Sequence, residues 1–292
     1  MKKVKFGYVA IVGETNVGKS TLLNAILKEK ISIATRRKNT TRNMIQGIYN
    51  DKDSQIVFID TPGFIKNTKN IYDKKIEKEI SNSISEIDIL LFLTPFWKEI
   101  NDNDLKRINN LKNVKKYLLI TQIDRSKNKH EIFTYASKFQ KEKTFDKIIP
   151  ISSRKNLNVT NLIEELKKDL PLDSPHFEID NKTNYEKEFF IKEIIREKLL
   201  LNLNYEIPHQ LLIQITNIKE NEKKIELEAK IILNRDSHKG IIIGKNGEMI
   251  DKIKEFVIYD LEKKYNKKII IKFIIKVEKD WKNKANIIGE NY

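Results

Sequence analysis

The stretch "GETNVGKS", residues 13 to 20, decides the fold. It fits the pattern G-x-x-x-x-G-K-[ST], follows an apolar run and precedes a helical pattern. The glycines let the backbone bend round a triphosphate with its N–H groups turned inward, and Lys19 is placed to bridge β- and γ-phosphate oxygens. Ser20 offers a hydroxyl to Mg²⁺. A strand–turn–helix that matches the pattern by chance is the alternative. It is disfavoured because the chain holds only nine glycines, and two of them fall in this eight-residue stretch.

A second motif, "DTPG" at residues 60 to 63, ends a later apolar strand. Asp60 is expected to hold Mg²⁺ through a water, and the Gly63 N–H to sense a γ-phosphate. Between the two motifs lies the polar, basic segment 34–44. A switch segment needs a threonine that reaches Mg²⁺; Thr40 and Thr41 are both candidates, and we prefer Thr41. A plain solvated loop is the alternative for this segment.

A third motif, "TQID" at residues 121 to 124, follows another apolar strand. The two carboxylate oxygens of Asp124 match the N1–H and N2–H₂ donors of guanine and repel N1 of adenine, a discrimination worth about 1–3 kcal/mol or more. Guanine-reading loops usually carry Lys where this chain has Gln122. Gln122 is shorter and neutral but still forms hydrogen bonds, so we predict guanine preference with affinity weakened by about 1 kcal/mol. An ordinary strand end with an exposed Asp is the alternative.

Short apolar strands alternate with helical patterns from residue 4 to 170, which predicts a doubly wound, mostly parallel α/β sheet with helices on both faces. The predicted strands are 5–13, 43–50, 54–60, 88–94, 115–121 and 147–152, and the predicted helices include 71–84, 102–112, 129–142 and 159–169. The strands 88–94 and 115–121 are apolar throughout, as expected for strands buried on both faces. This region, 1–170, is the first predicted domain.

Residues 171–184 are predicted to form a linker, because they contain two of the six prolines together with Asp, Ser and Asn. The second predicted domain, 185–292, has the order α-β-β-α-α-β, which indicates a small α+β domain. Its string "GKNG", residues 244 to 247, lies between an apolar segment and an amphipathic helix. A G-x-x-G turn that joins two helices is typical of KH domains, where it lets an RNA backbone approach closely. A glycine-ended helix is the alternative reading.

The composition narrows the function further. The chain has 292 residues, of which 39% are hydrophobic and 33% are charged, and its net charge is +15. This excess favours nucleic acid or an anionic membrane surface as a partner, or reflects a general abundance of Lys. There is no cysteine, which excludes disulfides and thiolate sites, and the four histidines are too scattered for a zinc site. No apolar run is long enough to span a bilayer, so we expect a soluble, cytoplasmic protein.

Taken together, the motifs resemble the Era family of bacterial GTPases almost from end to end. The resemblance includes "NVGKSTLLNAIL" (16–27), "DTPGF" (60–64), "EIIREKLL" (193–200) and "KGIIIGKNGEMI" (239–250). It implies a GTP-switched factor whose type II KH domain binds the 3′ end of small-subunit (16S) ribosomal RNA and which assists assembly of the small ribosomal subunit. It also implies a monomer with peripheral inner-membrane contact. The chain departs from the family pattern at Gln122 and in "SSRKN" (152–156).

The resemblance and the motifs give one set of expected site residues. The nucleotide, GTP or GDP, is expected to contact Gly13, Glu14, Thr15, Asn16, Val17, Gly18, Lys19, Ser20, Thr21, Asp60, Thr61, Pro62, Gly63, Phe64, Thr121, Gln122, Ile123, Asp124, Ser152 and Ser153. The expected Mg²⁺ ligands are Ser20, Thr41 and Asp60, and the expected catalytic residues are Lys19 and Thr41. The expected RNA contacts are Lys239, Ile243, Gly244, Lys245, Asn246 and Gly247.

Two further expectations concern catalysis. Phe64 stands where many small GTPases carry a water-orienting Gln, so we predict slow unassisted hydrolysis, on the order of 10⁻³ s⁻¹. Related GTPases with Asn at the Asn16 position use K⁺ as an activating ion, which makes K⁺ a hypothesis here. Two other functions stay open: an RNA-binding protein with a degenerate nucleotide pocket, and a membrane-surface GTPase whose basic patches meet lipid.

Overall fold

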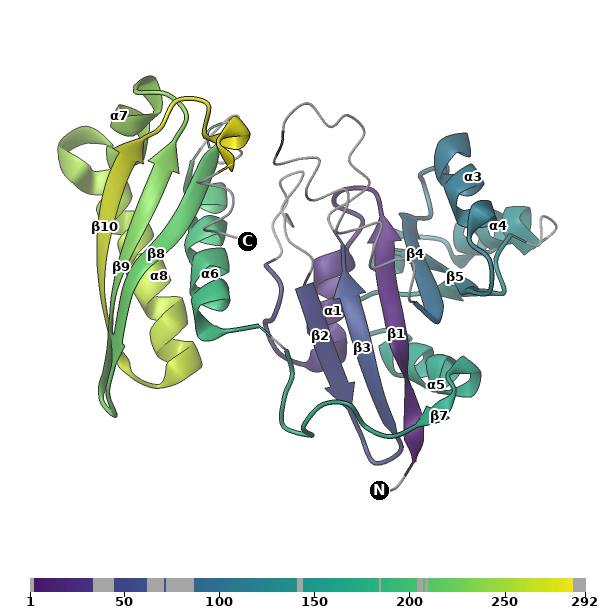
Figure 1. The fold of residues 1–292 in the computed structure, drawn as a ribbon. Helices are drawn as coiled ribbons and strands as arrows, with labels where there is room; N and C mark the ends of the chain where they lie inside the picture. Colours follow the sequence, from purple (N-terminus) through teal and green to yellow (C-terminus); the bar gives the residue numbers. More distant parts are fainter. Residues whose placement is uncertain are drawn as a thin grey trace. The chain divides into compact units, whose positions relative to one another are not determined.

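The computed structural model describes residues 3–33, 45–61, 71, 87–140, 144–183, 185–203, 207 and 210–285. The chain divides into two compact units: Met1–Lys66 with Ile76–Asn184, and Asn67–Lys75 with Tyr185–Tyr292 (Figure 1). Each unit has its own sheet and its own hydrophobic core. The domain boundaries at 170 and 184 remain a proposal from the sequence.

The first unit contains the predicted doubly wound sheet. Its strands are β1 (Val4–Gly13), β2 (Ile45–Asn50), β3 (Ser54–Asp60), β4 (Ile89–Pro95), β5 (Lys115–Thr121) and β6 (Lys147–Pro150). Their order is β2-β3-β1-β4-β5-β6, and every neighbouring pair is parallel except β2 with β3 (Figure 1). The prediction of a mostly parallel sheet is therefore confirmed.

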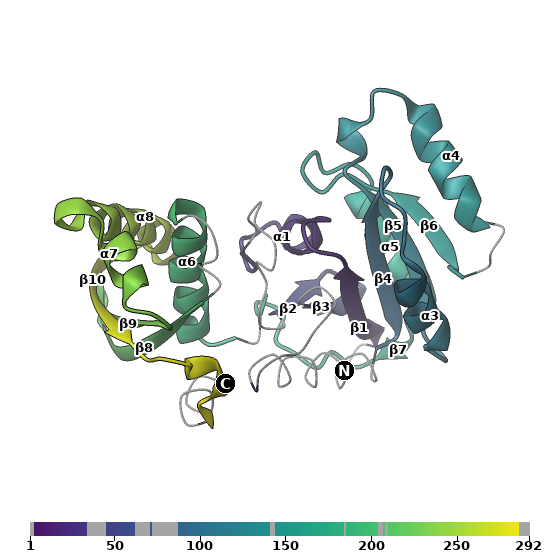
Figure 2. The ribbon, with the colours of Figure 1, turned by 90° about the horizontal axis from the view of Figure 1, so that it is seen from above.

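Helices bury both faces of this sheet, which explains the continuous apolar strands. The helices are α1 (Lys19–Leu27), α3 (Asp102–Asn110), α4 (Lys129–Gln140) and α5 (Val159–Asp169), seen from above in Figure 2. Ile108 of α3 and Tyr135 of α4 pack against one face. Leu91 and Leu119, which point to the other face, are also fully buried, and α1 and α5 pack together there. The predicted helix 71–84 lies outside the described residues except for Ile71.

The predicted linker is bonded to the first unit over most of its length. A short strand, β7 (Leu172–Asp173), pairs antiparallel with β1. The buried Gln55 side chain accepts the backbone N–H groups of His176 (2.7 Å) and Phe177 (3.0 Å) and donates to the Phe177 carbonyl (2.9 Å). The carbonyl oxygen of Lys182 accepts the Ile48 N–H at 2.8 Å. The chain is thus held against the sheet as far as residue 183.

The turn between β2 and β3 provides a test of stability. The Asp51 carboxylate is 2.5 Å from the Lys167 ammonium and accepts the Ser54 N–H at 2.8 Å. Burial raises the pKa of Asp51, but Lys167 and the N–H donors outweigh it and lower the pKa to about 2. We expect D51N to lower the free energy of unfolding by about 1 kcal/mol at pH 7, measured by urea denaturation.

The pH dependence of that loss has a defined sign. Because the folded-state pKa of Asp51 is lowered, its stabilisation is complete above the unfolded pKa near 4 and disappears as pH falls through about 2. The difference between wild type and D51N should therefore shrink to about half by pH 3. E99Q, which removes an exposed carboxylate 3.7 Å from Lys138, is the control. An undiminished difference at pH 3 would contradict the assignment.

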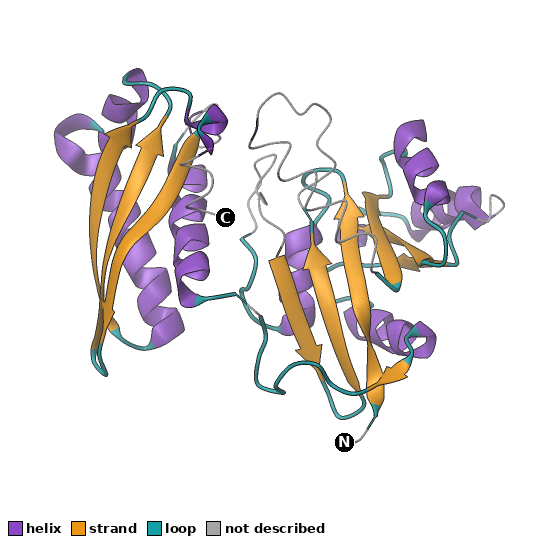
Figure 3. Ribbon diagram, in the orientation of Figure 1, coloured by secondary structure: helices purple, strands orange, loops and turns teal. Residues whose placement is uncertain are grey.

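The second unit has the predicted order α-β-β-α-α-β. Its elements are α6 (Lys187–Asn202), β8 (Leu211–Glu220), β9 (Lys224–Leu233), α7 (Ser237–Ile243), α8 (Glu248–Tyr265) and β10 (Lys268–Val277). β9 is the central strand, parallel to β10 and antiparallel to β8. Helices α6 and α8 lie on one face of this sheet (Figure 3). In β10, buried Ile269 and Ile271 alternate with exposed Lys268 and Lys272, as expected for a sheet covered on one face.

Candidate nucleotide site and GKNG turn

The phosphate loop connects β1 to α1. Gly13 is the last residue of β1 and has a φ of 141°. A Cβ atom on Gly13 would lie 2.4 Å from the Leu93 carbonyl oxygen, so no larger residue fits without moving β4. The loop therefore approaches the sheet closely before it turns into the helix at Lys19. This position at the carboxyl end of β1 is where ligands bind in open α/β sheets.

The Lys19 side chain is held inside the loop. Its ammonium donates to the carbonyl oxygens of Gly13 (3.0 Å) and Glu14 (2.8 Å), and the residue is only 6% exposed. Burial lowers the pKa of Lys19, while the charges of Asp60 and Glu14 raise it. An ammonium has three N–H donors, so two bonds to the loop leave one for a phosphate oxygen. Lys19 is thus oriented before any nucleotide arrives.

Three hydroxyl and carboxylate groups meet beside Lys19. The Ser20 hydroxyl donates to Asp60 Oδ2 at 2.7 Å, and the Ser32 hydroxyl donates to the same oxygen at 2.9 Å. Asp60 is fully buried. Oxygen ligands of this kind suit Mg²⁺, and a buried carboxylate favours a cation beside it. Ser20 and Asp60 therefore fit the predicted Mg²⁺ site, and they are joined by Ser32, which no sequence motif indicates.

The base-facing side of the site is formed by the loops after β5 and β6. Asp124 lies in a 3₁₀ turn, Ile123–Arg125, and its Oδ1 accepts the Ser152 hydroxyl at 2.5 Å. Ser152 is buried, and its backbone is paired with Leu157 in both directions. The Ser152 side chain therefore orients the Asp124 carboxylate, a role that the sequence motifs do not indicate.

The Gln122 side chain is long enough to reach the backbone of the phosphate loop. Its Nε2 donates to the carbonyl oxygen of Asn16 at 3.2 Å, so it ties the loop after β5 to the phosphate loop. The bond is exposed and neutral, which makes it worth about 1 kcal/mol or less. Lys at this position adds an aliphatic stem to cover a base.

We expect Q122K to tighten GTP binding about three- to tenfold and Q122A to weaken it by a similar factor. The measurement is the Kd of a fluorescent GTP analogue. Q46A, at a residue on β2 outside the expected contact set, is the control and should leave the Kd within twofold. Equal affinities for wild type, Q122K and Q122A would show that the bridge to Asn16 does not support binding.

The remaining predicted nucleotide contacts differ in their hydrogen bonds and in how far they are buried. The Thr61 hydroxyl donates to the Ile11 carbonyl (3.0 Å) and so joins β3 to β1. Thr121 is buried, and in the part of the chain that the structure describes its hydroxyl has no hydrogen-bond partner. Val17 is buried; Thr15, Gly18, Thr21, Ile123 and Ser153 are half-buried. Thr41, Pro62, Gly63 and Phe64 lie outside the described residues, as does Thr40.

The GKNG turn of the second unit joins α7 to α8. Gly244 has a φ of 77°, and a Cβ atom there would lie 2.7 Å from Met249 Cβ and 2.8 Å from its backbone nitrogen. Lys245 and Asn246 are exposed between the two glycines, and Lys239 is exposed on α7. Ile243 is half-buried, whereas its neighbour Ile242 is fully buried in the core and does not line the surface. A backbone turn with exposed polar side chains is thus available to a ligand.

These features define a class. A phosphate loop with its lysine already oriented, an acidic Mg²⁺ position and a fixed carboxylate after β5 are the parts of a P-loop GTPase. The second unit adds the G-x-x-G turn and the topology of a KH domain. The chain is therefore a GTPase of the P-loop class that carries a KH domain.

Comparisons with known proteins identify the family. Residues 8–123 match the family described as 50S ribosome-binding GTPase, and residues 206–282 match the KH domain. GTPase Era of Clostridium tetani is 39% identical over 98% of both chains, and that of Clostridium acetobutylicum is 40% identical over 98% of this chain and 97% of its own. The chain belongs to the GTPase Era family.

Solved structures agree with this assignment. A variant of Aquifex aeolicus Era bound to GDP and AlF₄⁻ superposes with a TM-score of 0.94 at 30% identity, covering 99% of each chain. Era in complex with MgGDPNP and nucleotides 1506–1542 of 16S ribosomal RNA superposes with a TM-score of 0.93 at 29% identity, covering 99% of this chain and 98% of that one.

Proposed function

We propose that the protein binds GTP with Mg²⁺ in the first unit, hydrolyses it, and binds small-subunit ribosomal RNA through the GKNG turn of the second. Two observations carry the nucleotide part of this proposal: the Lys19 ammonium is bonded to the phosphate loop, and the Ser20 hydroxyl is bonded to Asp60. The exposed turn at Lys245 and Asn246 supports the RNA part, as does the RNA bound to the related Era. The partner would then be the immature small subunit, whose assembly the protein assists.

Each residue of the nucleotide site has a role in this proposal. Lys19 meets the phosphate oxygens, Asp124 reads the base, and Ser20 and Asp60 hold Mg²⁺, with Thr41 as the third predicted ligand. When bound, Mg²⁺ supplies positive charge to the β- and γ-phosphate oxygens. The presence of Lys19, Ser20, Asp60 and Asp124 argues against a degenerate pocket, because these are the groups that phosphate, metal and base binding would require.

The cheapest test is a pair of titrations. Wild-type protein with Mg²⁺ should bind GTP at least 100-fold more tightly than ATP. Repeating the titration with a short RNA of the small-subunit 3′ end tests coupling, because any change in GTP affinity caused by RNA must be matched by an equal change in RNA affinity caused by GTP. Failure to bind GTP at millimolar concentration would remove the proposed function.

Hydrolysis is expected to be slow. Phe64 cannot orient water, so the chemical step would depend on Lys19, Mg²⁺ and any activating ion or partner. We keep K⁺ as a candidate ion near Asn16, which is an exposed residue of the phosphate loop. Single-turnover hydrolysis in KCl should exceed that in NaCl if K⁺ acts here; equal rates would end the hypothesis.

The cellular setting is proposed from the family. We expect a cytoplasmic monomer with peripheral contact to the inner membrane. None of the helices in the described ranges has the length and apolar character needed to cross a membrane. Binding to anionic vesicles and to RNA across a salt series separates the two surfaces, and light scattering measures the mass.

A further inference from the structure

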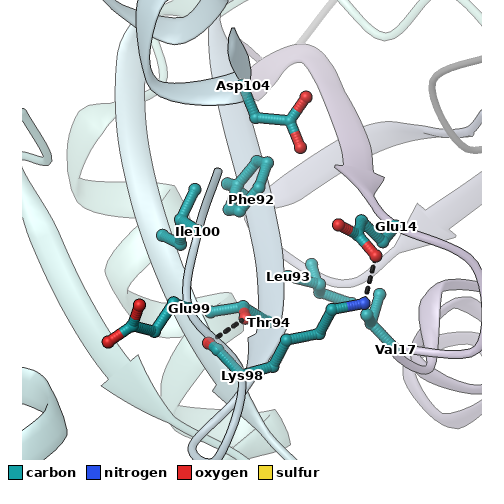
Figure 4. A pocket seen from close by; sticks show the side chains of 9 residues that line it. All are labelled: Glu14, Val17, Phe92, Leu93, Thr94, Lys98, Glu99, Ile100 and Asp104. Atoms are coloured by element: carbon teal, nitrogen blue, oxygen red, sulfur yellow. Dashed lines mark hydrogen bonds and ion pairs between the residues drawn. The ribbon is translucent and has the colours of Figure 1, made fainter. Parts of the chain in front are cut away.

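An ion pair joins a residue of the phosphate loop to a residue that follows β4. The Glu14 carboxylate pairs with the Lys98 ammonium, across a small cavity lined also by Val17, Leu93 and Thr94 (Figure 4). Asn101, which caps α3 through the Asp104 N–H, lies 3.5 Å from the second Glu14 oxygen. The phosphate loop is thus connected to the segment between β4 and α3.

The backbone of Lys98 is fixed by buried groups. Its carbonyl oxygen accepts the Tyr135 hydroxyl of α4 at 2.5 Å and the Thr94 hydroxyl at 3.2 Å. Its N–H donates to the Pro95 carbonyl at 3.0 Å. Thr94 and Tyr135 are both at least 95% buried. Lys98 therefore presents its ammonium from a segment anchored to both β4 and α4, rather than from a freely moving loop.

The other partner belongs to the loop that holds Lys19. The carbonyl oxygen of Glu14 accepts a hydrogen bond from the Lys19 ammonium at 2.8 Å. A carboxylate on the phosphate loop would repel a triphosphate unless its charge were offset. Pairing with Lys98 cancels that charge toward the nucleotide and fixes the residue whose carbonyl orients Lys19.

We propose that Lys98 is a positioning residue for guanine-nucleotide binding, which acts through Glu14 without touching the nucleotide. The inference rests on the proposed nucleotide site. The Lys98 ammonium would have two functions. It offsets the charge of the Glu14 carboxylate, and it ties the phosphate loop to a segment that is anchored to β4 and α4. Nothing in the motif pattern indicates Lys98, because it lies in none of the sequence motifs and meets Glu14 only in the folded chain.

The test compares K98M, E14Q and the double variant by titration with fluorescent GDP and GTP, together with thermal melting of the nucleotide-free proteins. K98M keeps the length of the side chain but removes the ammonium that pairs with Glu14, and should weaken binding about three- to tenfold. Adding E14Q to K98M should then tighten binding at least threefold, because it removes the carboxylate charge that the Lys98 ammonium no longer offsets. K98R should restore the wild-type Kd.

Recovery by a second substitution separates a charge effect from a loss of packing, which a second substitution would deepen. The loss in K98M should also shrink as KCl is raised, since the pair is part-exposed. E99Q, next along the chain, should leave the Kd within twofold. Wild-type affinity in K98M, or weaker binding in the double variant than in K98M, would overturn the proposal. Absence of GTP binding in the wild type would instead overturn the nucleotide site itself.

Discussion

D124N should lower the affinity for GTP on the order of 100-fold and give a preference for xanthosine triphosphate over GTP. The Asp124 carboxylate is expected to accept both N1–H and N2–H₂ of guanine, two charge-assisted bonds of about 1.5–3 kcal/mol each. An amide accepts from only one of these groups and turns its own donor toward the other. Xanthine has a carbonyl at that position, so it suits the amide. Competition titrations against a fluorescent nucleotide measure both affinities.

The matched control is S152A. It removes the hydroxyl that donates to Asp124 at 2.5 Å but keeps the carboxylate. We expect only a three- to tenfold loss of GTP affinity, with guanine still preferred, because the acceptors remain and only their orientation is relaxed. GTP binding by D124N within threefold of wild type, without gain for the xanthine nucleotide, would show that another group reads the base.

Most of the first unit could be predicted from the sequence because its determinants are local. The two glycines and Lys19 of the phosphate loop lie within eight residues of one another. The apolar character of β4 and β5 indicates that both faces of the sheet are covered. The ends of elements were less certain: β6 stops at Pro150 rather than residue 152, because the chain there turns into the paired segment that holds Ser152.

Contacts between residues distant in sequence could not be predicted. Ser32 reaches Asp60, Lys98 reaches Glu14, and Gln55 binds the segment at His176, separations of 28, 84 and 121 residues. None of these side chains is part of a recognisable pattern, and each position is set by strand order and packing. The predicted linker illustrates the same limit, since its Pro and Asp composition indicates loop backbone but not what the loop binds.

The second unit contains one feature that the sequence predicts and, beside it, one that it does not. The G-x-x-G string correctly predicted a turn between two helices, because positive φ at Gly244 is a local property. The neighbouring apolar run Ile241–Ile243 gives no local sign of which side chains are buried. Helical geometry divides it, with Ile242 in the core and Ile241 half exposed.

That turn carries the second large effect. G244A should weaken binding of a short single-stranded RNA from the small-subunit 3′ end at least 30-fold and leave GTP binding within twofold. The added methyl would lie 2.7–2.8 Å from Cβ and N of Met249, and it forces an L side chain into a φ of 77°. Relief requires the turn to move away from α8, which displaces the exposed Lys245 and Asn246 and closes the backbone approach that RNA needs.

Gly240 supplies a control within the same segment. It lies in α7, has ordinary helical geometry, and a Cβ atom there meets no other group within 4 Å. G240A should therefore bind RNA within about threefold of wild type and slightly stabilise the helix, because Ala is the better helix former. Circular dichroism and thermal melting establish that G244A remains folded. Tight RNA binding by a folded G244A would mean that RNA is held elsewhere, and the Lys-rich stretch from Lys263 to Lys284 would then be the surface to mutate.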